Sequence, residues 1–245
     1  MINYIKADLL RIFKRIPRYI VLVAGLGVLT AIMLSLAKEK SVYEIVDIAT
    51  KAMPYICALF GIIEFSFVYT DDIKAKTMQI AIGRGIGRGQ VILAKWIEHT
   101  LMCLLDCILV VAVIIICSNI RGAMFSGEPA ADVFILMLFG MVKVIGAAGI
   151  TMIVVFATLN PVLSVIVYIC SVFGILGLIF SLIVTIGPLE NAGLEKFVFT
   201  NLIETAKTRM IVGTVSVGHL LGILAYLAVF YIIALKVFEK QELEF

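Results

Sequence analysis

The chain has 245 residues, of which 62% are hydrophobic and 15% are charged, and its mean hydropathy is +1.14. Soluble domains contain roughly 45–50% apolar residues, so this composition indicates an integral membrane protein. Membrane spans of about 20 residues each would use most of the sequence, which leaves no room for a soluble ATPase, kinase or DNA-binding domain. The formal net charge of +3 is mild.

The first segment, residues 1–17, is predicted to be an amphipathic helix lying in the plane of the lipid headgroups. Basic residues fall mostly on one side of it, and Pro17 marks its end. The apolar residues that recur at helical spacing are Ile2, Ile5, Leu9, Phe13 and Ile16. A solvated basic tail is the alternative, but a continuous apolar face beside a membrane span favours an interfacial helix.

Six apolar runs follow, and they predict an all-α integral membrane protein with one transmembrane domain, residues 1–245. The expected spans are about 18–37, 52–69, 91–118, 131–157, 162–187 and 210–235. Residues 38–52 are expected to form the first outer loop. Residues 188–209 are too polar to span a membrane, and short helices at the outer interface are expected there. Most Lys and Arg residues flank the side that carries both termini, so this side is predicted to face the cytoplasm.

The most informative loop, residues 71–90, joins the second and third spans. Asp71 and Asp72 are expected to begin a short helix, where negative charge meets the positive end of the helix dipole. The exposed face of this helix is predicted to combine charged residues with Met78 and Ile82. Glycines then let the backbone turn, and basic residues anchor the loop to anionic headgroups. These residues are Gly83, Gly85, Gly87 and Gly89, followed by Arg84, Arg88 and Lys95.

The run G-R-G-I-G-R-G in this loop invites comparison with phosphate-binding loops. It matches GxGxxG only loosely, follows no predicted strand and lacks a GK[ST] ending. A structural turn is therefore favoured over a nucleotide site.

With its flanking residues, the loop resembles that of type-2 ATP-binding-cassette exporter permeases. Glu64-Phe65, Lys76-Thr77, Gly85-Ile86-Gly87-Arg88 and Ala94-Lys95 occupy the places of that family's motif, with Gly87 and Ala94 departing from its usual serines. Chain length, the interfacial helix, the six spans and the semi-polar segment before the sixth span also resemble this family. Within it, the chain looks like the short permeases of lantibiotic-immunity and antimicrobial-peptide exporters.

The resemblance implies a coupling helix that fits a groove on a separate ATPase. The residues implied in ATPase coupling are Asp71, Asp72, Lys74, Lys76, Thr77, Met78, Gln79 and Ile82, and those of the turn and its anchor are Glu64, Gly83, Gly85, Gly87, Arg88 and Lys95. It also implies a homo- or heterodimer of permeases in the cell membrane, with ATP and magnesium bound by two partner ATPase subunits. This chain itself would then be no enzyme and hold no cofactor, and would export an amphipathic peptide, antibiotic or lipid-like substrate.

Two charged residues fall inside predicted spans, where charge is costly and usually has a partner. Asp106 and Lys143 lie at similar depths, about 16 and 21 Å from the inner side at 1.5 Å per residue. We therefore expect them to approach each other. The pair could be a structural contact, the lining of a polar substrate route, or a contact that changes between two states.

The remaining reactive side chains indicate no catalytic or metal site. The cysteines all lie in apolar runs without a CxxC pair, as expected of small buried hydrophobes. Glu64 and His99 are expected to be interface or anchoring groups, and His219, with Gly218 and Gly222, to mark close helix packing. An intramembrane enzyme would need a nucleophile or metal set that the two histidines do not supply. A membrane scaffold or sensor without an ATPase partner is the other alternative, and neither alternative, nor the permease, involves nucleic acid.

Overall fold

The computed structural model describes residues 2–36, 41–122, 125–186 and 194–241, and this part of the chain is helical without strands. Five of its helices are long and apolar enough to cross a membrane. They are α2 (Ile16–Leu36), α3 (Val42–Phe65), α6 (Arg88–Ile120), α7 (Glu128–Thr158) and α11 (Val217–Lys240). The expected all-α class is confirmed, and these helices are those of a membrane-embedded protein.

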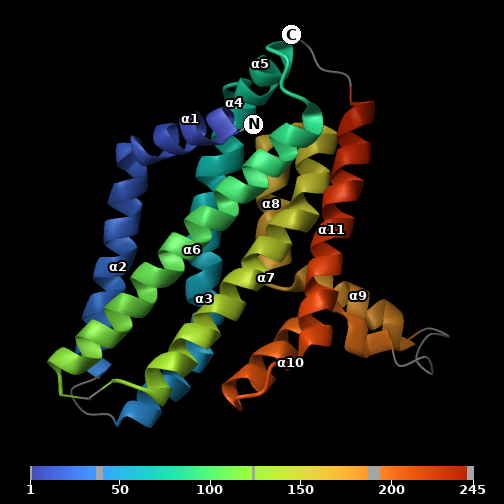
Figure 1. Ribbon diagram of the computed structural model, residues 1–245. Coiled ribbons are helices and arrows are strands. Elements are labelled where there is room, and N and C mark those ends of the chain that lie inside the picture. The colour runs from blue at the N-terminus through green and yellow to red at the C-terminus, as the bar shows by residue number, and fades with distance from the viewer. Residues whose placement is uncertain (1, 37–40, 123–124, 187–193, 242–245) are drawn as a thin grey trace.

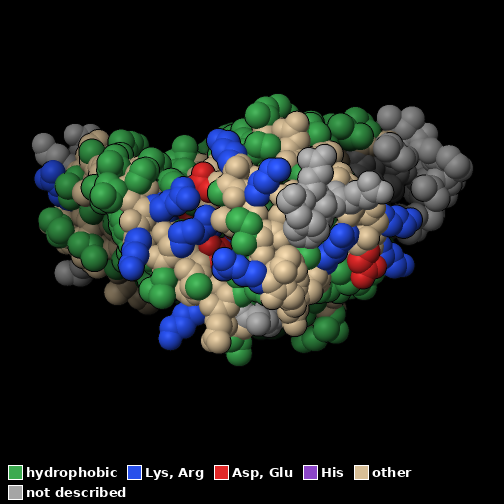
Figure 2. Space-filling model, turned by 90° about the horizontal axis from the view of Figure 1, so that it is seen from above, with side chains coloured by type: hydrophobic (Ala, Val, Ile, Leu, Met, Phe, Trp, Pro, Cys, Tyr) green, Lys and Arg blue, Asp and Glu red, His purple; other side chains and the backbone are tan. Residues whose placement is uncertain are grey.

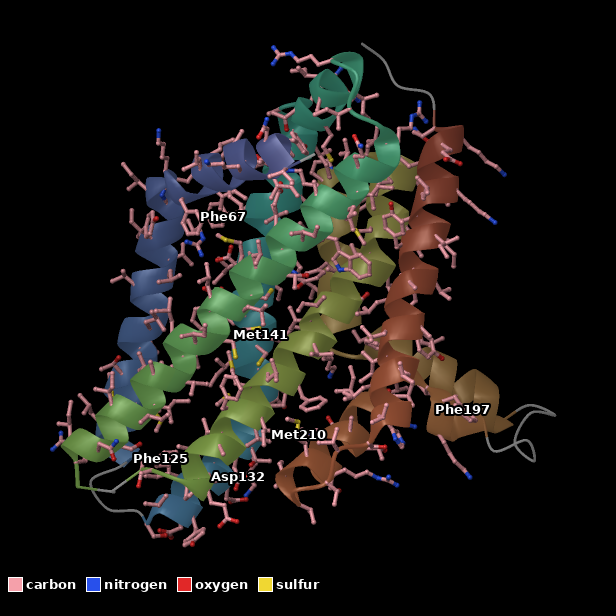
Figure 3. All side chains as sticks on the ribbon, in the orientation of Figure 1. Phe67, Phe125, Asp132, Met141, Phe197 and Met210 are labelled. Atoms are coloured by element: carbon pink, nitrogen blue, oxygen red, sulfur yellow. The ribbon has the colours of Figure 1, made fainter. Side chains whose placement is uncertain are left out.

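The long helices run side by side, with α7 in contact with α3, α6 and α11 (Figure 1). The helix α1 (Ile2–Phe13) and the short α4 (Asp71–Lys74) and α5 (Thr77–Gly83) lie at one end of the bundle, where α11 also ends. We call this the loop end. In Figure 3, Phe125 and Asp132 mark the opposite end.

The second long helix begins well before the predicted span near residue 52. Ser41 caps α3, since its hydroxyl accepts from the Glu44 backbone N–H while the Glu44 carboxylate accepts from the Ser41 N–H. Most of the predicted outer loop is therefore helix, and residues 37–40 lie outside the described part. At the other end, α3 continues through the π-helix η1 (Ser66–Thr70) directly into α4.

The fifth apolar run is broken in its middle. It forms α8 (Pro161–Val172) and α9 (Ile175–Ile186), separated at Gly174, whose φ is 80°. At 1.5 Å per residue, a 12-residue helix is about 18 Å long, which is short of a hydrocarbon core of about 30 Å. A continuous span at 162–187 is therefore not formed, because Gly174 adopts a left-handed conformation that interrupts the helix.

The segment before α11 is helical, as expected, although residues 187–193 lie outside the described part. It contains the 3₁₀ turn η3 (Leu194–Phe197) and α10 (Phe199–Ile211), which packs on α7 and α11. The last long helix starts at Val217 rather than near 210, because α10 runs on to Ile211 and a turn with Gly213 at φ 79° follows.

Small residues let α7 approach its neighbours closely. A Cβ placed on Gly61 of α3 would lie 2.3 Å from Cγ1 of Val144, and one on Gly140 would lie 2.4 Å from Sγ of Cys57. On α11, a Cβ on Gly222 would lie 3.1 Å from Leu202, whereas Gly218 has open space around it. Close packing near His219 is therefore confirmed at Gly222 and not at Gly218.

Candidate functional site at the loop end

The loop between α3 and α6 is two short helices and a defined turn. Lys76 has a left-handed backbone (φ 53°), which ends α4 and redirects the chain into α5. After α5, the Ile86 N–H donates to the Ala81 carbonyl and the Gly85 N–H to that of Ile82, with Gly85 at φ 91°. This pattern is a Schellman motif, in which glycine is favoured because it adopts positive φ without strain.

The four glycines of the predicted turn have different structural roles. Gly85 alone of the four has a positive φ, while Gly87 precedes α6 as its N-cap and Gly83 is the last residue of α5. Gly89 lies on α6 where α11 approaches, with the Tyr231 hydroxyl donating to its carbonyl at 3.3 Å.

The outer side of this loop is exposed and mostly basic. Figure 2 views this end of the bundle and shows Lys and Arg side chains gathered over it. We define the loop surface as Lys74, Lys76, Ile80 and Arg84, which are all exposed. Thr77, Gln79 and Ile82 are half-buried at its margin.

Two residues expected on that surface are buried beneath it. Met78 is only 2% exposed and packs in the main apolar core, and Asp72 is 1% exposed. The prediction of Met78 on the exposed face is therefore wrong, because helical spacing gives the two faces of α5 but not which one meets the bundle. Ile80, on the other face, is 50% exposed.

A buried group of charged side chains ties the loop to α1 and α6. We call Asp8, Arg11, Asp72, Lys95 and Glu98 the charge cluster. Arg11 Nε lies 2.6 Å from Asp8 Oδ1, and Lys95 Nζ lies 3.0 Å from Glu98 Oε2. Lys95 also pairs with Asp8 and Asp72, and Arg11 pairs with Asp72. The cluster therefore connects three elements that are far apart in the chain.

The centre of the cluster is Lys95, which is fully buried. It was expected to reach lipid headgroups, and three carboxylates surround it instead. The Tyr4 ring adds a cation–π contact at 5.6 Å from Nζ. Burial, with smaller contributions from the nearby Asp72 and Glu98 charges, raises the pKa of Tyr4, so its hydroxyl stays protonated.

A second buried charge group lies deeper. Arg18 Nε donates to Glu64 Oε1 at 3.0 Å, and Arg18 Nη2 lies 3.8 Å from Asp106 Oδ1. All three side chains are almost completely buried. Glu64, expected to anchor the loop, thus holds the start of α2.

The expected Asp106–Lys143 pair is not formed: within the described residues, the cation paired with Asp106 is Arg18. Lys143 lies instead in the wall of cavities that face α8–α10. The prediction of this pair was based on similar depth, and depth does not give the direction in which a side chain leaves its helix.

Other predicted residues have roles different from those expected. The Arg88 guanidinium donates to the carbonyls of Glu239 at 2.9 Å and Gln241 at 2.8 Å, so it caps α11 rather than binding headgroups. Asp71 pairs with Arg15 of the segment after α1. His99 is buried, with its Nε2 3.3 Å from the Tyr168 hydroxyl, and does not pair with Glu64.

Four members of these charge groups are not among the site residues predicted from the sequence: Asp8, Arg11, Arg18 and Glu98. A weak signal exists for three of them, because Asp8 precedes Arg11 by three residues and Glu98 follows Lys95 by three. Within the described residues, no group of three or more His, Cys, Asp or Glu side chains is arranged to hold a metal ion.

No protein-family model matches the chain, and no curated protein matches it either. Function must therefore be inferred from the geometry. The geometry is an exposed loop surface on short helices whose buried side is joined by ion pairs to α1 and α6.

Proposed function

We propose that this chain is the permease subunit of an ATP-binding-cassette exporter, in which a separate ATPase docks on the loop surface. The observation that carries the proposal is the contrast between the two sides of the loop. Its outer side exposes Lys74, Lys76, Ile80 and Arg84, while Asp72 beneath them is held by Arg11 and Lys95. A docking element that must move membrane helices needs both an accessible face and a stiff attachment.

The proposed mechanism is a shift between two packings of the bundle. Two ATPase subunits that close on ATP and magnesium would displace the loop of each permease subunit. Because the charge cluster joins α4 to α1 and α6, these elements would move with the loop. Such a shift requires only that the ATP-bound partner bind one packing more tightly than the other.

The proposal includes a topology of six crossings with both termini in the cytoplasm. The chain must return between α7 and α11, and α8 with α9 would supply that fifth crossing in two pieces. The working unit would be a homo- or heterodimer of permeases in the cell membrane. Its substrate would be an amphipathic peptide, antibiotic or lipid-like molecule.

The test is charge reversal on the loop surface. The triple variant Lys74→Glu, Lys76→Glu, Arg84→Glu should insert and purify normally but lose ATP hydrolysis in the complex isolated from native membranes. The matched control, Lys6→Glu with Lys14→Glu, reverses an exposed lysine of α1 and the exposed lysine that follows this helix, and it should keep that activity. ATP hydrolysis that persists in the triple variant, or a wild-type protein isolated without an ATP-hydrolysing subunit, would contradict the proposal.

A further inference from the structure

A cavity of about 270 Å³ lies beside α7, where the α8–α9 break, α10 and α11 meet. Its walls are mostly apolar and include Ile150, Phe199 and Phe230. Lys143 is the one charged side chain among its lining residues. In Figure 3, Met141, which precedes Lys143 by two positions on α7, marks the middle of the bundle.

Lys143 lies deep in the proposed membrane-spanning part and has no acidic partner among the described residues. At 1.5 Å per residue, it is about 22 Å from each end of α7. Among the described residues, no carboxylate lies within ion-pair distance of its Nζ. Glu204, which lines a smaller adjoining cavity, pairs with Lys207 instead. A charged side chain at bilayer depth is by default a candidate functional site.

The broken helix strengthens this argument. A Cβ placed on Gly174 would lie 3.9 Å from Lys143 Nζ, and α9 starts at the next residue. The positive end of the α9 dipole is therefore close to the ammonium. At the end of α8, the carbonyls of Ile169 and Ser171 already accept N–H groups from Phe173 and Gly174. The Lys143 ammonium and the N-terminal end of α9 thus lie together at the cavity, next to the C-terminal end of α8, and both favour an anionic group, as the N-termini of discontinuous helices do at mid-membrane sites.

The hydroxyl groups that line the cavity differ in whether their protons are free to donate to a ligand. Ser171 donates to the Val167 carbonyl at 2.7 Å, and Tyr226 donates to the Phe197 carbonyl at 2.9 Å. Their protons are therefore engaged. Thr200 also lines the cavity, and its hydroxyl can donate a hydrogen bond to a ligand there.

We propose that this cavity binds an anionic amphiphile taken from the bilayer. Its acid group accepts hydrogen bonds from Lys143 Nζ and the Thr200 hydroxyl, and its hydrocarbon chain lies along Phe199, Phe230 and Ile150. The assignment of this ligand as the exported substrate rests on the proposed permease function. Binding itself does not, since it needs neither an ATPase nor ATP.

The experiment uses the full chain in nanodiscs of phosphatidylcholine without any partner subunit. Two probes carry the same photoreactive acyl chain, one on phosphatidylglycerol and one on phosphatidylcholine, and crosslinked peptides are mapped by mass spectrometry. We expect the acidic probe to label peptides of α7–α10 several-fold more than the neutral one. Because a charge-assisted hydrogen bond contributes about tenfold or more in affinity, Lys143→Met should remove this preference.

Two control variants separate the site from general attraction of acidic lipid. Lys143→Arg keeps a cation in the cavity and should keep the preference, as should Lys51→Met, which removes an exposed lysine of α3. Equal labelling by both probes in the wild type, labelling confined to the loop end, or a preference that survives in Lys143→Met would overturn the proposal. The wild-type comparison decides the question even if a variant does not fold, and ATP hydrolysis in the native complex tests the permease function separately.

Discussion

At the level of single residues, Lys95 holds the loop end together. Its ammonium is the common partner of Asp8 from α1, Asp72 from α4 and Glu98 from its own helix. Taking these charges out of water is costly, and such a group is stable only when every charge retains an opposite one nearby. Removing the central cation should therefore be far more damaging than removing a lysine at the surface.

The Lys95→Met variant is expected to lose about 3–5 kcal/mol of unfolding free energy, because it leaves the buried Glu98 without its cation and leaves Asp8 and Asp72 to share Arg11 alone. Thermal or denaturant unfolding in detergent measures the loss. The control Lys51→Met breaks a pair whose side chains are 75% and 63% exposed, and pairs of that kind contribute about 0–1 kcal/mol. Equal stability of the two variants would show that the cluster does not stabilise the fold.

The second buried charge group, Arg18 with Glu64 and Asp106, can be tested by a double-mutant cycle. Arg18→Met leaves the carboxylates of Glu64 and Asp106 without their shared cation, so it should destabilise the protein more than Glu64→Gln does. The variant that combines both changes should lose less stability than the sum of the two, with a coupling of about 0.5–3 kcal/mol. Strictly additive losses would mean that Arg18 and Glu64 do not interact in solution.

At the level of helices, glycine sets the distance between α3 and α7. Gly61→Ala would place a methyl group 2.3 Å from Val144 Cγ1 and 2.9 Å from the Tyr168 hydroxyl oxygen. Overpacking of this kind costs about 1–3 kcal/mol, which we expect as a lower unfolding midpoint in detergent. Gly27→Ala on α2 meets nothing within 4 Å and should leave the midpoint unchanged or slightly raised.

The sequence predicts the presence of helices well and their orientation poorly. Apolar run length correctly indicates α2, α6 and α7 within a few residues. It cannot indicate that Asp106 faces Arg18, or that Met78 faces the core, because the rotation of a helix about its axis is decided by long-range packing. The break at Gly174 was missed because glycine is frequent within membrane helices, so one glycine in an apolar run is a weak signal.

At the level of the whole molecule, α1, the α4–α5 loop and the end of α11 share one end of the bundle (Figure 1). Under the proposed topology, epitope tags placed at both termini should be accessible to protease in inside-out vesicles and protected in right-side-out vesicles. A sealed-vesicle control with a known cytoplasmic protein reports leakage. If one tag were cleaved only in inside-out vesicles and the other only in right-side-out vesicles, an even number of crossings would be refuted.

The candidate site was predictable in location but not in construction. The D-D-I-K-A-K-T segment and its glycines correctly marked a helix and turn between two long helices. The charge cluster beneath the loop surface was not predictable, because Asp8 and Lys95 meet only in the folded bundle. A sequence pattern reports neighbours within a few positions, whereas these partners come from separate helices.

The pairing of Asp8 with Lys95 has a consequence for the order of synthesis. The two residues are 87 positions apart, so a ribosome completes α1, α2 and α3 well before the ammonium group emerges. Among the described ion pairs, Asp8 can until then form only the one with Arg11, on the next turn of its own helix. The ion pairs that α1 makes with α6 can therefore form only after the start of α6 has been synthesised, and the charge cluster is completed late.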